Sequence, residues 1–112
     1  MMVTATSSPF GSSTRTRALL AMRLLVETYA RELARFLDLN LSGVQKALRS
    51  LEADGLVAAR AVGRTRVYRL GPRAGARKDL ERYLDGLLVT ETKLRAKAAT
   101  LRRRPRKAGK PA

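Results

Sequence analysis

The spacing of apolar residues changes its period at Gly55, and this change constrains the fold more than any other feature of the chain. Across residues 30–54, apolar side chains recur every three or four positions, which is the spacing of amphipathic helices. Residues 56–70 are instead rich in Val, Tyr and small side chains, with Gly63 and Arg64 at their centre. That pattern is typical of a hairpin with a two-residue turn. The chain therefore predicts helices followed directly by a β-hairpin.

Three helices are expected before the hairpin. The first is capped by Ser13 or Thr14 and runs to about Val26. A short link, residues 27–29, separates it from a brief second helix over residues 30–38. The order of elements is thus helix, helix, helix and hairpin, and the third helix carries the most polar face.

The third helix, residues 41–54, begins after Asn40, a good N-cap, and stops at Gly55. Its apolar residues share one face, namely Val44, Leu48 and Leu51. Polar residues share the opposite face, namely Ser42, Gln45, Lys46 and Arg49. Such side chains can hydrogen-bond base edges or hold phosphates in a major groove, and Gly43 leaves room for a close approach. A solvated amphipathic helix is the alternative interpretation.

The hairpin that follows is strongly basic. Its arginines are Arg60, Arg64, Arg66 and Arg69, and residues 56–77 contain no acidic side chain. Two helices joined by a short link place a recognition helix against DNA, and a basic hairpin next to them can act as a wing on a minor groove or a flanking phosphate. We therefore expect DNA contacts from Arg60, Arg64 and Arg66. An edge hairpin that carries charge against aggregation is the alternative.

The net charge of +15, from 24 Lys and Arg against 9 Asp and Glu, indicates a polyanionic partner. Nine of the basic residues lie in the segment 92–112, which has no acidic residue. The end of this segment, residues 102–112, is predicted to be a disordered tail that adds affinity by neutralising phosphates. A solubility tail is the alternative. Residues 1–13 are predicted to be a flexible arm.

The chain contains neither Cys nor His, which excludes disulfides and the usual thiolate and imidazole metal sites. It also lacks the commonest general base, and no acid, base and nucleophile converge in the sequence. We therefore expect no enzyme activity, no metal and no cofactor. Without an apolar run of membrane length or a secretory signal, the expected location is cytoplasmic, in association with the nucleoid.

A last helix is predicted over residues 76–101, with apolar positions alternating in steps of four and three. Those positions are Leu80, Leu84, Leu87, Glu91, Leu94, Ala98 and Leu101. This is the heptad seam of a helical pair, so a homodimer is expected through Leu80, Leu84, Leu87 and Leu94. Glu91 and Gly86 weaken this interpretation, and the alternative is that the first leucines only cover the winged core.

The segment YARELARFLDLNLSGVQKALRSLEADGLV, followed by GRTRVYRL, resembles the helix-turn-helix and wing of ArsR- and MarR-like bacterial regulators. The resemblance covers residues 14–72 approximately. It implies that the major groove is read by Ser42, Gly43, Gln45, Lys46 and Arg49, and that Arg64 and Arg66 are wing contacts. FGSSTRTRALL and YARELA also resemble short regulators encoded beside nucleotidyltransferase genes, which suggests a toxin-antitoxin-like context.

The expected fold is mainly α with a small β-hairpin: a winged helix-turn-helix over residues 14–75, with a three-helix core, a two-stranded wing and a C-terminal helix. The expected function is sequence-specific binding of double-stranded DNA by a transcriptional regulator. Repression would follow from occupying a promoter, but the sequence does not decide between a repressor and an activator. Two alternatives stay open. One is a nonspecific architectural or RNA-binding protein, and the other is an antitoxin-like module that binds a protein partner.

Overall fold

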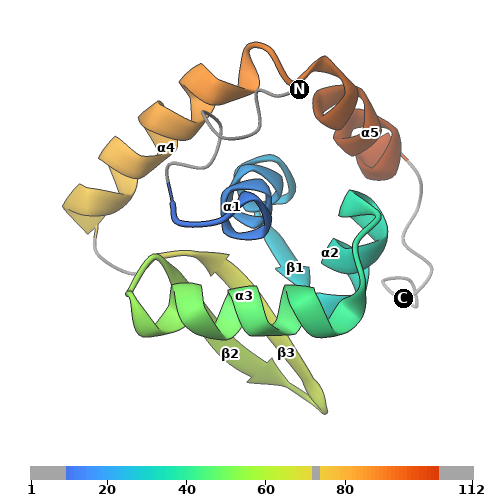
Figure 1. Cartoon of the computed structure of the whole chain (residues 1–112), viewed down its shortest axis with the longest axis vertical. Helices are drawn as coiled ribbons and strands as arrows, with labels where there is room; N and C mark the ends of the chain where they lie inside the picture. Colours follow the sequence, from blue (N-terminus) through green and yellow to red (C-terminus); the bar gives the residue numbers. More distant parts are fainter. Residues whose placement is uncertain (1–9, 72–73, 104–112) are drawn as a thin grey trace.

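The computed structural model describes residues 10–71 and 74–103, so residues 1–9 and 104–112 of the expected arm and tail lie outside it. The elements follow in the order α1 (Ser13–Leu25), β1 (Glu27–Tyr29), α2 (Ala30–Leu37), α3 (Leu41–Ala53), β2 (Val57–Val62), β3 (Thr65–Leu70), α4 (Ala74–Leu88) and α5 (Thr92–Arg103). The prediction of a mainly α fold with a small β wing is confirmed (Figure 1).

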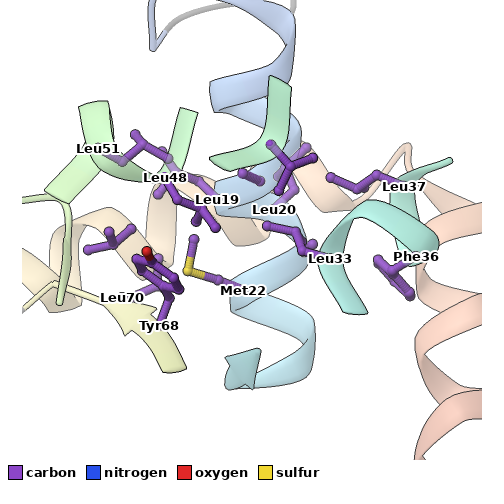
Figure 2. Close-up of a cluster of buried hydrophobic side chains, with 14 of the residues drawn as sticks. Leu19, Leu20, Met22, Leu33, Phe36, Leu37, Leu48, Leu51, Tyr68 and Leu70 are labelled. Carbon is purple, nitrogen blue, oxygen red and sulfur yellow. The ribbon is translucent and has the colours of Figure 1, made fainter. Parts of the chain in front are cut away.

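Helix α1 occupies the centre of the molecule, with the other helices arranged around it (Figure 1). Its consecutive residues 18–22 are all buried. A stretch that is apolar on every side of a helix has to be surrounded, and α1 is packed against α2, α3, α4 and α5. Leu19 and Met22 from α1 meet Leu33, Leu48 and Tyr68 in the same cluster (Figure 2).

The wing is part of a three-stranded antiparallel sheet in the order β1-β3-β2. Strands β2 and β3 pair from Val57 opposite Leu70 to Val62 opposite Thr65, which confirms the predicted hairpin and its two-residue turn. Gly63 has a φ of 64°, the positive sign that primed hairpin turns require and that glycine adopts without a steric penalty.

The predicted link at residues 27–29 is instead the strand β1. Thr28 pairs with Tyr68 of β3 and is only 2% exposed. Its hydroxyl donates to the Glu32 carboxylate at 2.8 Å, so the buried polar group has a partner. Strand β1 thereby ties the inner strand of the wing to the start of α2.

The prediction of one continuous helix over residues 76–101 is wrong, because the chain turns at residues 89–91 between α4 and α5. The two helices pack on different sides of α1 (Figure 1). This turn lets Leu84 of α4 and Leu94 of α5 both reach the core cluster around α1, and the β-branched pair Val89 and Thr90 favours an end to the helix there. The Glu91 carbonyl then accepts from the Arg95 N–H as α5 begins.

The leucines of the predicted dimer seam are packed in the protein's own core. Leu84 is fully buried and Leu94 is 8% exposed, and both belong to the cluster around α1. Leu80 and Leu87 are partly buried against the same cluster. Packing within one chain therefore accounts for the seven-residue pattern, and a dimer through these leucines stays a prediction.

The expected flexible arm is ordered in its last part. Phe10 packs against the core, with its ring 5.8 Å from that of Tyr83 in an edge-to-face arrangement. The Ser12 hydroxyl caps α1 by accepting from the Arg15 N–H at 3.1 Å.

Within the described residues, no helix has the length and apolar character needed to cross a bilayer.

Candidate nucleic-acid interface

Helix α3 separates its two faces as the sequence predicts. Val44, Leu48 and Leu51 are completely buried against α1 and the sheet. The opposite face is exposed at Ser42, Gln45, Lys46 and Arg49. The polar side chains are therefore available to a partner, and the apolar ones fix the helix on the core.

The start of α3 is held by its N-cap. The Asn40 Oδ1 atom accepts from the Gly43 N–H at 2.7 Å and from the Ser42 hydroxyl at 3.2 Å. Gly43 permits this arrangement, since a Cβ atom at that position would lie 3.0 Å from Asn40 Oδ1. Two of the predicted contact residues, Ser42 and Gly43, thus have a structural role at the cap in the free protein.

An open groove of about 540 Å³ lies between α3 and the wing. Its lining combines residues of α2, α3 and the hairpin, and its charged and amide side chains are Arg31, Gln45, Arg49, Glu52, Arg64 and Arg66. The structure thus brings together four of the predicted contact residues. Lys46 is exposed on α3 outside this lining. Four guanidinium groups around one groove make it suited to the phosphates of a nucleic acid.

Arg66 crosses from the wing to α3. Its Nη2 atom lies 2.7 Å from Oε2 of Glu52, and its Cζ atom lies 6.0 Å from the centre of the Tyr68 ring. The negative charge of Glu52 is the main cause that raises the pKa of Arg66 above its ordinary value, with a hydrogen bond to Tyr68 as the next cause. Although residues 56–77 contain no acidic side chain, Arg66 has an acidic partner, because Glu52 comes from α3.

Arg60 lies on the other face of the sheet. Arg60 of β2 is paired with Val67 of β3, so their side chains lie on the same face of the sheet. Arg66 precedes Val67 in β3, and successive residues of a strand point to opposite faces. The Arg60 guanidinium lies 3.0 Å from the Glu27 carboxylate of β1, so it too has an acidic partner. The structure therefore does not bring Arg60 into the groove with Gln45 and Arg49, and its contact with DNA stays a prediction.

Sequence reasoning missed two charged residues of the groove. Arg31 on α2 was not predicted as a contact residue, but it lines the groove. Glu52 was not singled out, although its position seven residues after Gln45 and three after Arg49 places it on the same helical face. Spacing alone could have identified Glu52, whereas Arg31 depends on how α2 packs beside α3. The described residues contain no acidic cluster that could hold a metal ion.

No protein-family model and no curated protein matches the chain, but solved structures do. An apo mutant of ZitR from Lactococcus lactis matches with a TM-score of 0.53 and 22% identity, over 73% of this chain and 64% of ZitR. Reduced HlyU from Vibrio cholerae matches with a TM-score of 0.51 and 27% identity, over 64% of this chain and 72% of HlyU. This chain thus spans less than two thirds of the ZitR chain.

A third match is the homodimeric winged helix-turn-helix DNA-binding domain of Mb0332 from Mycobacterium bovis, a possible ArsR-family transcriptional regulator. Its TM-score is 0.52 and its identity 24%, over 80% of this chain and 76% of that domain. Together with the order of elements described above, these matches show that the chain has the winged helix-turn-helix fold.

Proposed function

We propose that this winged helix-turn-helix chain is a transcriptional regulator that binds a specific site in double-stranded DNA, in the manner of ArsR- and MarR-like proteins. The observation that carries the proposal is the groove between α3 and the wing, in which Gln45 and Arg49 lie beside Arg64 and Arg66. Gln45 and Arg49 have side chains that pair with adenine and guanine edges, and the wing arginines suit phosphates.

The packing and capping of α3 support specific binding. The exposed face of α3 is backed by fully buried residues and by a side-chain N-cap, so its polar groups are presented from a fixed support. A rigid support matters because base readout requires several hydrogen bonds to form at once. The net charge of +15 would add a salt-dependent attraction for any duplex.

A homodimer that acts as a repressor is part of the proposal. Two copies would present two α3 helices to two half-sites, and occupation of a promoter would block transcription. Mb0332, which shares the fold, is homodimeric. Since Leu84 and Leu94 are used in the core, the surface that joins two copies has to include residues that are exposed in one chain.

The proposal is tested by duplex binding at two salt concentrations, with fragments from upstream of the protein's own gene and scrambled fragments of equal length. Gln45→Ala and Arg49→Ala should each weaken binding to the preferred fragment roughly tenfold, because a lost base contact costs about 1–3 kcal/mol. Lys78→Ala is the matched control, since Lys78 is an exposed cation on α4, away from the groove.

The expected result is binding to one fragment that survives the higher salt and is weakened in the α3 variants. Equal binding to all fragments, abolished by salt and insensitive to Gln45→Ala, would contradict sequence-specific regulation. It would instead favour the nonspecific architectural role, which depends on charge alone.

A further inference from the structure

Glu52 has an unusual position for a carboxylate in a groove that should receive phosphates. The described residues that line the groove include four arginines and Gln45, and Glu52 is the one acidic group among them. It lies in the last turn of α3 on the same face as Gln45 and Arg49. A phosphate that enters the groove therefore approaches Glu52 as well as the arginines.

The Glu52 carboxylate already occupies one of the four cations. Its Oε2 atom is 2.7 Å from Nη2 of Arg66, while 55% of the Arg66 side chain and 33% of the Glu52 side chain are exposed. Carboxylate and phosphate oxygens compete for the same donors on a guanidinium. A phosphate can therefore bind Arg66 in this conformation only by sharing or displacing Glu52.

Displacing Glu52 from Arg66 costs little free energy by itself, because an exposed ion pair contributes little to stability. The larger cost comes afterwards, since the released carboxylate would lie beside a phosphate of the same charge. A duplex of unrelated sequence holds the groove through phosphate contacts alone, so it meets this repulsion in full. A matching duplex is fixed by base contacts with Gln45 and Arg49, which seat its phosphate on Arg66 and away from Glu52, so it meets less of the repulsion.

We propose that Glu52 is a specificity-determining residue that holds Arg66 in the free protein and selects against DNA of unrelated sequence. This inference rests on the proposed function. In the free protein Arg66 bridges the wing and α3. In the complex with a matching site, Arg66 leaves Glu52 and binds a phosphate of the DNA backbone. In complexes with other duplexes, the Glu52 carboxylate weakens the binding of phosphate in the groove.

The test compares Glu52→Gln with Asp85→Asn in binding to a preferred duplex and to a scrambled duplex, over a range of salt concentrations. Asp85→Asn removes the same charge from α4, which lies across α1 from α3 and the wing (Figure 1). Both variants are checked by thermal unfolding. Arg66→Gln and the double variant Glu52→Gln/Arg66→Gln complete the comparison.

Glu52→Gln should raise affinity for the scrambled duplex by roughly three- to tenfold at low salt, and the preferred duplex should gain less. The slope of log affinity against log salt should steepen by about one, as one more phosphate contact predicts. In the Arg66→Gln background, the effect of Glu52→Gln should fall to that of Asp85→Asn, because the released cation is then missing.

Two results would overturn the inference. The first is equal behaviour of Glu52→Gln and Asp85→Asn, which would make Glu52 only one charge among others. The second is a loss of affinity confined to the preferred duplex, which would mean that Glu52 reads a base. Failure of the proposed function is a different outcome, in which the wild-type protein itself does not distinguish the two duplexes or binds neither.

Discussion

The guanidinium of Arg15, at the start of α1, lies 2.7 Å from the carboxylate of Asp54, which follows α3. The same side chain donates to the Ser50 hydroxyl and to the Phe10 carbonyl. A cation in the first turn of a helix is unfavourable for the helix dipole. Here the carboxylate of another helix compensates for it within the chain, so Arg15 joins the N-terminus of α1 to the C-terminus of α3.

We expect Arg15→Ala to lower the free energy of unfolding by about 1–2 kcal/mol, because three partners lose a charged donor. Arg17→Ala is the control. Arg17 is exposed on the same helix and has no ion pair among the described residues, so its replacement should change stability by less than about 0.5 kcal/mol. Urea unfolding of the variants measures both values. Equal effects would mean that the Arg15 bridge contributes nothing to stability.

Gly43 and Asn40 should be energetically coupled. Alanine at position 43 gains about 1 kcal/mol in helix propensity but places a Cβ atom 3.0 Å from the capping oxygen of Asn40. Loss of the cap by Asn40→Ala should cost about 1 kcal/mol. We therefore expect Gly43→Ala to be more stabilising in the Asn40→Ala background than in the wild type. A double-mutant cycle from urea unfolding checks this, and additive effects would show that the cap tolerates the methyl group.

Replacing Leu84 distinguishes a residue of the core from a residue of a dimer interface. Leu84 is fully buried within one chain, so Leu84→Ala should destabilise the fold by about 2–5 kcal/mol at every protein concentration. Val89→Ala is the control, because Val89 is 66% exposed between α4 and α5. Unfolding is followed at several protein concentrations together with sedimentation velocity. A Leu84→Ala variant that keeps its stability but dissociates would restore the seam interpretation.

Arg23 and Asp85 link α1 to α4 by a bidentate contact, with oxygen-to-nitrogen distances of 2.8 and 3.1 Å. The hydrogen bond from Arg23 is the main cause that lowers the pKa of Asp85 below its ordinary value. A lowered pKa in the folded state means that the contribution to stability is complete above the unfolded pKa, about 4, and is lost as the pH falls through the folded pKa.

The stability difference between the wild type and Asp85→Asn should therefore be present at neutral pH and shrink below about pH 4. Urea unfolding over this range measures it. Asp79→Asn is the control, because Asp79 is an exposed carboxylate of the same helix without an ion pair among the described residues. A difference that stays constant with pH would show that Asp85 titrates alike in the folded and unfolded chain.

The parts of the fold that depend on local signals could be predicted from the sequence. The Asn40 side chain caps α3 by accepting from the N–H of Gly43, only three residues later in the chain. Gly63 permits the hairpin turn because it adopts a positive φ. The faces of α3 follow from helical spacing alone. Each of these features depends on residues that are close together in the sequence, so these elements and most of the groove could be predicted from the sequence.

The remaining features depend on contacts between distant segments. Strand β1 is only three residues long and exists because β3 lies beside it. The partners of Arg60 and Arg66 come from β1 and α3, which no local pattern reveals. The seven-residue spacing of the last leucines fits either a straight helix in a dimer or two helices around α1, and only the position of α1 decides between them.

The pairing of β1 with β3 also divides the wing into parts that close at different stages. The β2–β3 hairpin joins neighbours in the chain, whereas β1 can pair only after α2, α3 and the hairpin have been brought back to it. Loops of that length close more slowly than a hairpin turn. We expect the backbone amides in the Glu27–Arg69 pair to exchange with solvent sooner than those of the β2–β3 hairpin. This order would mean that the hairpin separates from β1 before its own two strands separate.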